Sequence, residues 1–237
     1  MSSSSCELSV ILTAYKRDYF EEQIQSILNQ TLSIPPSNIY LWQNEQHIDV
    51  TKYREKYGIK VVRSDENFSF YSRFVFAHLM KTEYVVILDD DIIPGKKWLE
   101  NSLHLCKTKN CIVGANGRSW NQYTNKYDGF GDHQLYREMK VDFVGHSWLF
   151  KKKWLQYLWM IEPYTYDNGE DMHFCYCAKH FGNIDSYICG RSTLDECADL
   201  TNNRYGTDEL ASCKTKQNFR NCRNEIAIYL RNKSMTM

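Results

Sequence analysis

Three adjacent aspartates, Asp89, Asp90 and Asp91, are the residues of this 237-residue chain whose type and spacing most directly indicate chemistry. They follow the apolar run 84–88, which is typical of a strand buried on both faces. Neighbouring carboxylates raise one another's pKa and burial raises it further, so the cluster is costly unless a cation neutralises it. The sequence therefore predicts a site for Mg²⁺ or Mn²⁺, ions that prefer oxygen ligands. If extended geometry persists, Asp89 and Asp91 project to the same side; the alternative is a solvated acidic turn.

A second group of potential ligands consists of His173, Cys175, Cys177 and His180. Its spacing matches no standard zinc finger or ribbon. In the helix expected here, residues 173, 177 and 180 share one stripe, which favours core packing. The chain has nine cysteines and no Cys-x-x-Cys pair, so we expect reduced, mostly buried thiols rather than a disulfide framework.

The elements that must position these residues alternate between strand and helix patterns, which predicts an α/β architecture. An Asp18/Glu21 capping box is expected to open the first helix, and Gly182 to end the helix that starts after Asn168, as a C′ glycine. Strands are expected at 8–14, 39–42, 59–62, 84–88, 112–115, 141–144 and 147–150, and further helices at 69–80, 98–106, from 153 and at 218–230.

Composition limits the remaining possibilities. The 29 acidic and 29 basic residues cancel, so no global field attracts nucleic acid or an anionic membrane. No window contains the roughly 20 apolar residues that span a bilayer, and the N-terminus lacks the pattern of a signal peptide. We expect a soluble, cytoplasmic, single-domain protein with a flexible tail at residues 1–6.

Over about residues 8–195 the chain resembles the GT-A glycosyltransferases, in particular the exostosin-like family and small viral and bacterial enzymes of similar layout. The resemblance depends on an ordered set of short motifs: Thr13-Ala14-Tyr15-Lys16-Arg17, Trp42-Gln43-Asn44, Asn67 with Arg73, the aspartate triad, Asn168-Gly169-Glu170-Asp171-Met172-His173 and Gly190-Arg191-Ser192-Thr193. It implies a GT-A fold in one domain. A Rossmann-like nucleotide-sugar-binding half, about residues 8–110, has a mixed central sheet flanked by helices, and about residues 111–237 form the acceptor-binding half.

The resemblance also implies roles for individual residues. Asp91 is the direct metal ligand, and Asp89 contacts the ribose or a metal-bound water; the metal is Mn²⁺ or Mg²⁺. Glu170 and Asp171 face the acceptor as catalytic residues. His146 and Trp148 fall where the acceptor cleft forms. The donor, a UDP-sugar, is expected to contact Thr13, Ala14, Tyr15, Arg17, Asn44, Asn67, Arg73, Asp89, Asp90 and Arg191.

Several alternatives stay open. Asp171 is a general base in an inverting enzyme, but in a retaining enzyme it stabilises the oxocarbenium-like sugar or orients the acceptor. It is alternatively a simple helix-start carboxylate. Arg17 and Arg73 could alternatively be surface salt-bridge partners. His146 and Trp148 could alternatively be ordinary core residues. The competing functions are a metal-dependent phosphohydrolase or nucleotidyltransferase, which usually carries a second carboxylate cluster, and a non-catalytic carbohydrate-binding protein.

Overall fold

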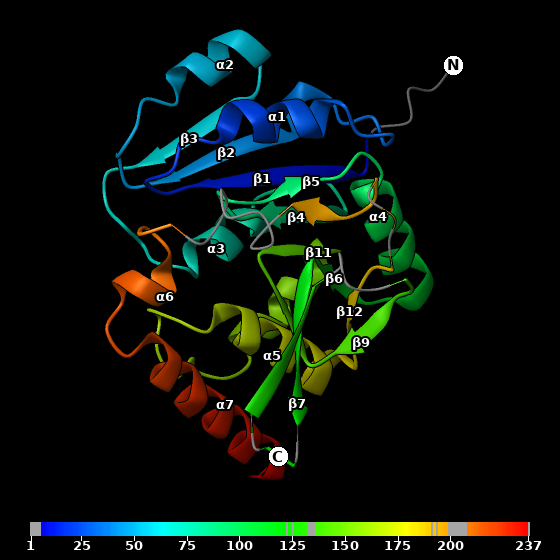
Figure 1. Ribbon diagram of the computed structural model, residues 1–237, viewed down its shortest axis with the longest axis vertical. Helices are drawn as coiled ribbons and strands as arrows, with labels where there is room; N and C mark the ends of the chain where they lie inside the picture. The colour runs from blue at the N-terminus through cyan, green and yellow to red at the C-terminus, as the bar shows by residue number, and fades with distance from the viewer. Residues whose placement is uncertain are drawn as a thin grey trace.

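The computed structural model describes residues 6–121, 123–124, 126–131, 136–190, 192, 194–198 and 208–236 (Figure 1). Its main element is an eight-stranded mixed sheet with the order β3-β2-β1-β4-β11-β6-β12-β9. Strands from the first half of the chain form one side of this sheet, and strands from the second half form the other. One sheet therefore runs through both halves of the chain.

The first half supplies four parallel strands with helices between them. β1 and β4 lie side by side at the centre, with every β4 residue buried, as the apolar runs predict. The elements are β1 (Leu8–Ala14), α1 (Phe20–Leu28), η1 (Pro36–Asn38), β2 (Ile39–Asn44), α2 (Thr51–Tyr57), β3 (Lys60–Ser64), α3 (Ser72–His78), β4 (Tyr84–Leu88), β5 (Ile93–Pro94) and α4 (Trp98–Lys109).

The second half extends the sheet and adds a separate antiparallel layer. β11 pairs antiparallel with β4, and β10-β7-β8 form a three-stranded sheet beside α5 and α7 (Figure 1). The elements are β6 (Ile112–Gly114), β7 (Asn116–Asn121), β8 (Lys126–Gly131), β9 (Met139–Val141), β10 (Phe143–Gly145), β11 (Ser147–Lys151), η3 (Lys152–Trp159), α5 (Glu170–Gly182), β12 (Ser186–Ile188), β13 (Cys197–Ala198), α6 (Ser212–Thr215) and α7 (Phe219–Thr236).

The core lies between the central sheet and its helices. Trp98, Trp148 and Trp154 are its largest buried side chains, and Phe74 packs edge-on against Trp148. None of the nine cysteines forms a disulfide. Within the described part of the chain, no helix is long and apolar enough to cross a membrane.

The structure corrects four local predictions. The Asp18/Glu21 capping box does not form, because the Asp18 carboxylate accepts a hydrogen bond from Tyr53 Oη at 2.5 Å and α1 has no side-chain cap. Gly182 is not the C′ residue: it is the last residue of α5, and Asn183 takes the left-handed conformation at φ 51°. The single strand expected at 141–144 is two strands separated at residue 142, and the helix from 153 is the 3₁₀ segment η3.

Candidate functional site

The three aspartates form a turn at the carboxyl end of β4. The Ile92 N–H donates to the Asp89 carbonyl at 3.2 Å, so the extended geometry that would aim Asp89 and Asp91 to the same side does not persist. The Asp90 and Asp91 side chains are only 10% and 13% exposed. Burial, followed by the charge of Asp91, raises the pKa of Asp90 to about 8, and burial followed by the charge of Asp89 raises the pKa of Asp91. The cluster is therefore a partly buried acidic turn rather than a solvated one.

Arg17 lies against this turn from the end of β1. Its Nη1 is 2.7 Å from Asp90 Oδ1 and 3.4 Å from Asp91 Oδ2. Its Nε and Nη2 each donate to Asp208 at 2.7 Å, which makes a bidentate pair with the chain segment before α6. The residue is 9% exposed, so it is a buried partner of the acidic turn and not a surface salt-bridge residue.

Arg73, from α3, joins the acidic turn to the acidic pair of α5. Its Nη1 pairs with Asp89 and its Nη2 pairs with Glu170. Its guanidinium lies 4.4 Å from the centre of the Trp148 ring, in a cation–π contact. Burial raises the pKa of Glu170, and the charge of Arg73 opposes that rise. Arg73 therefore brings together Asp89 and Glu170, which are 81 residues apart in sequence.

Asp171 is held by a residue of the C-terminal helix α7. Arg223 Nη1 and Nη2 lie 3.0 and 2.7 Å from the two carboxylate oxygens of Asp171, and the Met172 N–H donates to Oδ1 at 2.7 Å. Asp171 is 6% exposed. The contact fixes the direction of the carboxylate, because both oxygens meet donors on one rigid guanidinium.

The other residues expected at the donor form two groups. Asn44, at the end of β2, donates to Asn67 Oδ1 at 3.0 Å and accepts from the Phe68 N–H at 2.8 Å, so the two asparagines are linked directly. Thr13 donates to the Leu88 carbonyl at 2.9 Å, and Ala14 is buried in the core at 1% exposure. Tyr15 is half-buried beside them, and Arg191 lies outside the described residues.

His146 and Trp148 differ in their surroundings. Trp148 is 1% exposed and its indole N–H donates to the Val144 carbonyl at 2.9 Å, so it presents no open ring face to an acceptor. This geometry fits the core-packing interpretation. His146 adopts φ 64°, and its carbonyl accepts from the Asp89 N–H at 3.0 Å. His146 therefore lies beside the acidic turn.

The structure adds three residues that the sequence analysis missed. The amide of Gln23, fully buried in α1, donates to the carbonyls of Asp89 and Ile92 at 2.7 Å each and so fixes the turn. Gln23 interrupts the apolar stripe of α1, and Arg223 shares a helix face with buried Ala227 and Leu230 of α7. A polar residue on an otherwise apolar helix face could have indicated Gln23 and Arg223 from the sequence. No local sequence pattern indicates Asp208.

Three members of the histidine and cysteine cluster of α5, His173, Cys175 and Cys177, pack in the core, whereas His180 is exposed. His173 is 1% exposed, with its Nε2 3.0 Å from the Leu158 carbonyl and 3.6 Å from Cys177 Sγ, and Cys175 is fully buried. Among the described residues, no group of three or more His, Cys, Asp or Glu side chains is arranged to hold a metal ion. A metal at the acidic turn would therefore need ligands from a substrate or water.

Comparisons with known proteins were made against families, curated proteins and solved structures. Residues 9–159, well over half of the chain, match the model of glycosyl transferase family 2. No curated protein matches. One similar structure is that of GalNAc-T7 with UDP, GalNAc and Mn²⁺, with a TM-score of 0.63 and 11% sequence identity over 79% of this chain and 43% of that chain. Another is that of S. aureus TarS, with a TM-score of 0.54 and 18% identity over 80% of this chain and 37% of that chain. The chain thus spans less than half the length of either neighbour, and the likeness is one of fold.

Proposed function

The chain belongs to glycosyl transferase family 2 and has the GT-A fold, and we propose from this membership that it transfers a sugar from a nucleotide-sugar donor to a hydroxyl group of a glycan or glycoconjugate. The observation that carries the proposal is the meeting of the acidic turn, Arg17, Arg73 and the acidic pair of α5 at the carboxyl ends of β1 and β4. Ligands of open α/β sheets bind at this edge. Because the central sheet contains strands from both halves, we also propose that residues 8–237 act as one catalytic domain.

The nucleotide is assigned to the ends of β1 and β2. Tyr15 and the linked pair Asn44 and Asn67 supply an aromatic face and amide groups for a base and ribose, and Arg17 and Arg73 supply cationic groups for a diphosphate. The GalNAc-T7 structure contains UDP, which favours a UDP-sugar as the first donor to test. Arg191 remains a candidate partner of the pyrophosphate.

The residues of the acidic turn fit a divalent cation. Asp91 Oδ1 and His146 Nδ1 are buried and have no hydrogen-bond partner among the described residues, so each is available to a ligand. Asp91 and Asp89 would hold Mn²⁺ or Mg²⁺, which usually binds one or two carboxylates together with substrate phosphates. Such an ion would stabilise the charge of a departing diphosphate.

At the acceptor side, we assign the acid–base role to Asp171. Asp171 is the candidate to accept the proton of the acceptor hydroxyl in an inverting reaction, or to orient that hydroxyl in a retaining one. Arg223 must yield one carboxylate oxygen, or share it, for either role, because both oxygens are engaged. Glu170, paired with Arg73, positions that arginine toward the donor phosphates.

A panel of nucleotide sugars tests the proposal against its alternatives. The full chain is incubated with each donor, with Mn²⁺ or with EDTA, and the released products are separated by chromatography. Release of free nucleoside diphosphate that requires Mn²⁺ supports glycosyl transfer or its side reaction with water. Release of phosphate or of a nucleoside monophosphate would instead support the phosphohydrolase or nucleotidyltransferase, and no release and no nucleotide binding would support the carbohydrate-binding protein.

A further inference from the structure

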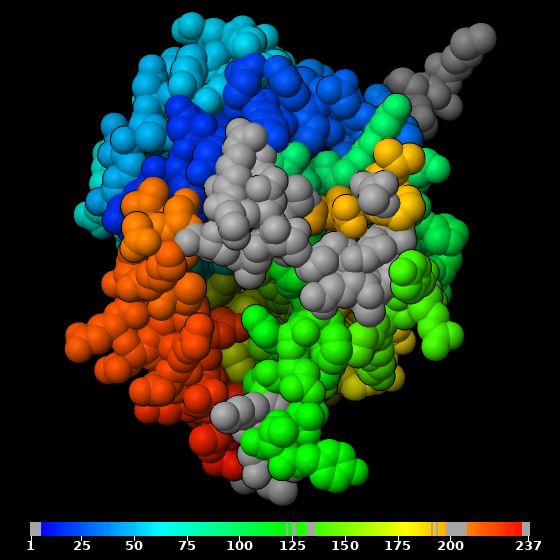
Figure 2. All heavy atoms as spheres, viewed as in Figure 1, coloured from blue at the N-terminus to red at the C-terminus, as the bar shows by residue number. Residues whose placement is uncertain are grey.

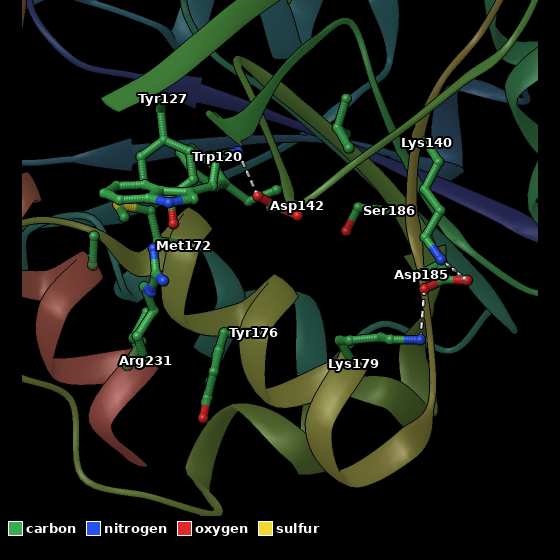
Figure 3. Close-up of a pocket in the computed structure, with 14 residues that line it drawn as sticks. Trp120, Tyr127, Lys140, Asp142, Met172, Tyr176, Lys179, Asp185, Ser186 and Arg231 are labelled. Carbon is green, nitrogen blue, oxygen red and sulfur yellow. Dashed lines mark hydrogen bonds and ion pairs between the residues drawn. The ribbon is translucent and has the colours of Figure 1, made fainter. Parts of the chain in front are cut away.

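A cavity of about 280 Å³ lies between α5, α7 and the strands β7 to β10, next to the acidic pair (Figure 3). Met172, which follows Asp171 directly, lines it, so the cavity adjoins the proposed acceptor side without containing the acidic turn. Its volume is just below the range of drug-sized ligand cavities, ~300–1,000 Å³, as suits a single sugar unit. Figure 2 shows a hollow between the C-terminal helices and the β7–β8 hairpin on this face of the molecule.

One wall of the cavity is aromatic. The rings of Trp120 and Tyr127 meet edge to face with centroids 5.1 Å apart, and Tyr127 meets Phe143 in the same way at 5.1 Å. The guanidinium of Arg231, from α7, lies 4.4 Å from the centre of the Trp120 ring. Aromatic faces pack against the C–H surface of a pyranose, and an arginine held beside them meets an anionic substituent on that ring.

The opposite wall carries two lysines that share one acid. Lys140 and Lys179 lie 2.9 and 2.8 Å from the two oxygens of Asp185 (Figure 3). Asp142, the second acid of the cavity, accepts a hydrogen bond from the Trp120 backbone N–H at 2.7 Å. The lining as a whole carries three cations, Lys140, Lys179 and Arg231, against the two carboxylates Asp142 and Asp185, so its net charge is positive by one.

Further cations connect the cavity to Asp171. Phe143, which lines the cavity, is paired with Arg118 in the β10–β7 register, and its ring lies 5.5 Å from the Arg223 guanidinium. No carboxylate among the described residues forms an ion pair with Arg118. Burial, and then the charge of Arg223, lowers the pKa of Arg118, whereas the charge of Asp171 raises it. Arg118 is therefore within electrostatic range of the Arg223–Asp171 ion pair.

We propose that the acceptor is an acidic saccharide, whose reacting hydroxyl lies at Asp171 and whose neighbouring sugar, bearing a carboxylate or phosphate, occupies this cavity. The inference rests on the proposed function, because it takes Asp171 as the acceptor-side residue. The aromatic wall binds the ring, and Arg118, Arg231 and the lysine pair bind the anion. An acidic acceptor would offset the net positive charge of the cavity lining, and a neutral acceptor would not.

Binding to the full-length chain tests the inference with defined probes. The carboxylate arm compares trigalacturonate with its methyl ester, and the phosphate arm compares mannose 6-phosphate with mannose, each titrated by NMR. We expect the acidic member of at least one arm to bind about tenfold or more tightly than its neutral counterpart. Arg118→Gln should remove most of that preference. Trp120→Ala should weaken acidic and neutral members alike, with Trp120→Phe retaining most of the affinity. Arg54→Gln, on exposed α2, is the matched control and should change neither.

Two outcomes overturn the inference: equal binding of acidic and neutral members in both arms, or a preference that survives unchanged in folded Arg118→Gln protein together with undiminished affinity in folded Trp120→Ala protein. UDP binding with Mn²⁺, measured in parallel, separates this failure from failure of the proposed function. Retained UDP binding without an acidic preference removes only the acceptor inference. If nucleotide binding is absent but an acidic preference that depends on Arg118 is present, the donor assignment fails and a carbohydrate-binding site remains.

Discussion

Replacing Asp171 by asparagine tests the acceptor-side assignment most directly. Asparagine keeps the shape of the side chain and one acceptor oxygen, but it removes the negative charge and the basic site. Asp171 is 6% exposed and both of its oxygens contact Arg223. The change therefore removes a proton acceptor without opening a cavity, and donor affinity should stay within a few-fold of the wild-type value.

The magnitudes follow from these contacts. Hydrogen bonds to charged groups contribute about 1.5–3 kcal/mol each, against about 1 kcal/mol for neutral ones. The Arg223 side chain is 23% exposed, so water solvates part of the guanidinium after the change. We expect the free energy of unfolding to fall by about 1–3 kcal/mol. Turnover should fall by about 10²-fold or more, the scale of a positioned acid or base.

The assay combines urea denaturation with the rate of nucleoside diphosphate release in the presence of acceptor. Arg223→Gln and the double variant complete a cycle, in which the coupling energy for stability should be about 1–3 kcal/mol because the two groups are in contact. Asp49→Asn is a control for stability loss alone, since Asp49 accepts from the Thr51 N–H at 2.9 Å at the start of α2. If folded Asp171→Asn protein turns over at close to the wild-type rate, Asp171 is a structural helix-start residue and the reasoning is refuted.

Three further predictions address the metal, the packing and the thiols. Asp91→Ala should abolish the Mn²⁺-dependent part of nucleotide-sugar binding, and unchanged affinity in calorimetry would contradict the ligand assignment. Gly182→Ala should lower the free energy of unfolding by about 1 kcal/mol or more, because the added Cβ would lie 2.5 Å from the Tyr157 ring. This steric clash outweighs the better helix propensity of alanine. A variant that is more stable than the wild type in urea denaturation would contradict this prediction. Iodoacetamide at pH 8 should label exposed Cys213 in the folded protein and leave Cys175 unlabelled, since burial raises the pKa of Cys175 to about 12, and peptide mass mapping before and after unfolding checks this order.

The sequence predicted the parallel half of the fold well because each strand there is a short apolar run. The bounds of β1 and β4 are those expected, and β2, β3 and α3 differ by a few residues at their ends, whereas α2 was not predicted. The hairpin of β7 and β8 was missed because its strands carry polar, aromatic and glycine residues and have no apolar alternation. The Asp18 cap failed for a tertiary reason, since Tyr53 of α2 binds that carboxylate instead.

The sequence predicted those site residues that directly follow a strand and belong to a charged or amide type that binds ligands. The aspartates, Arg17 and Arg73 lie together, and so do Asn44 and Asn67. The local geometry was not predictable, because Asp89 to Asp91 form a turn that depends on hydrogen bonds from Gln23. Contacts made by the C-terminal segment were also not predicted. Arg17 and Asp208 lie far apart in sequence, so no local sequence pattern indicates that they pair.

Charge balance at the site gives an independent reason for a divalent cation. Among the described residues, three arginines, Arg17, Arg73 and Arg223, form ion pairs with six carboxylates: Asp89, Asp90, Asp91, Glu170, Asp171 and Asp208. The excess is negative at the buried turn, where burial and then the charge of Asp91 raise the pKa of Asp90. A nucleoside diphosphate would add further negative charge beside this turn. We therefore expect donor affinity to rise with Mn²⁺ concentration until the turn is saturated.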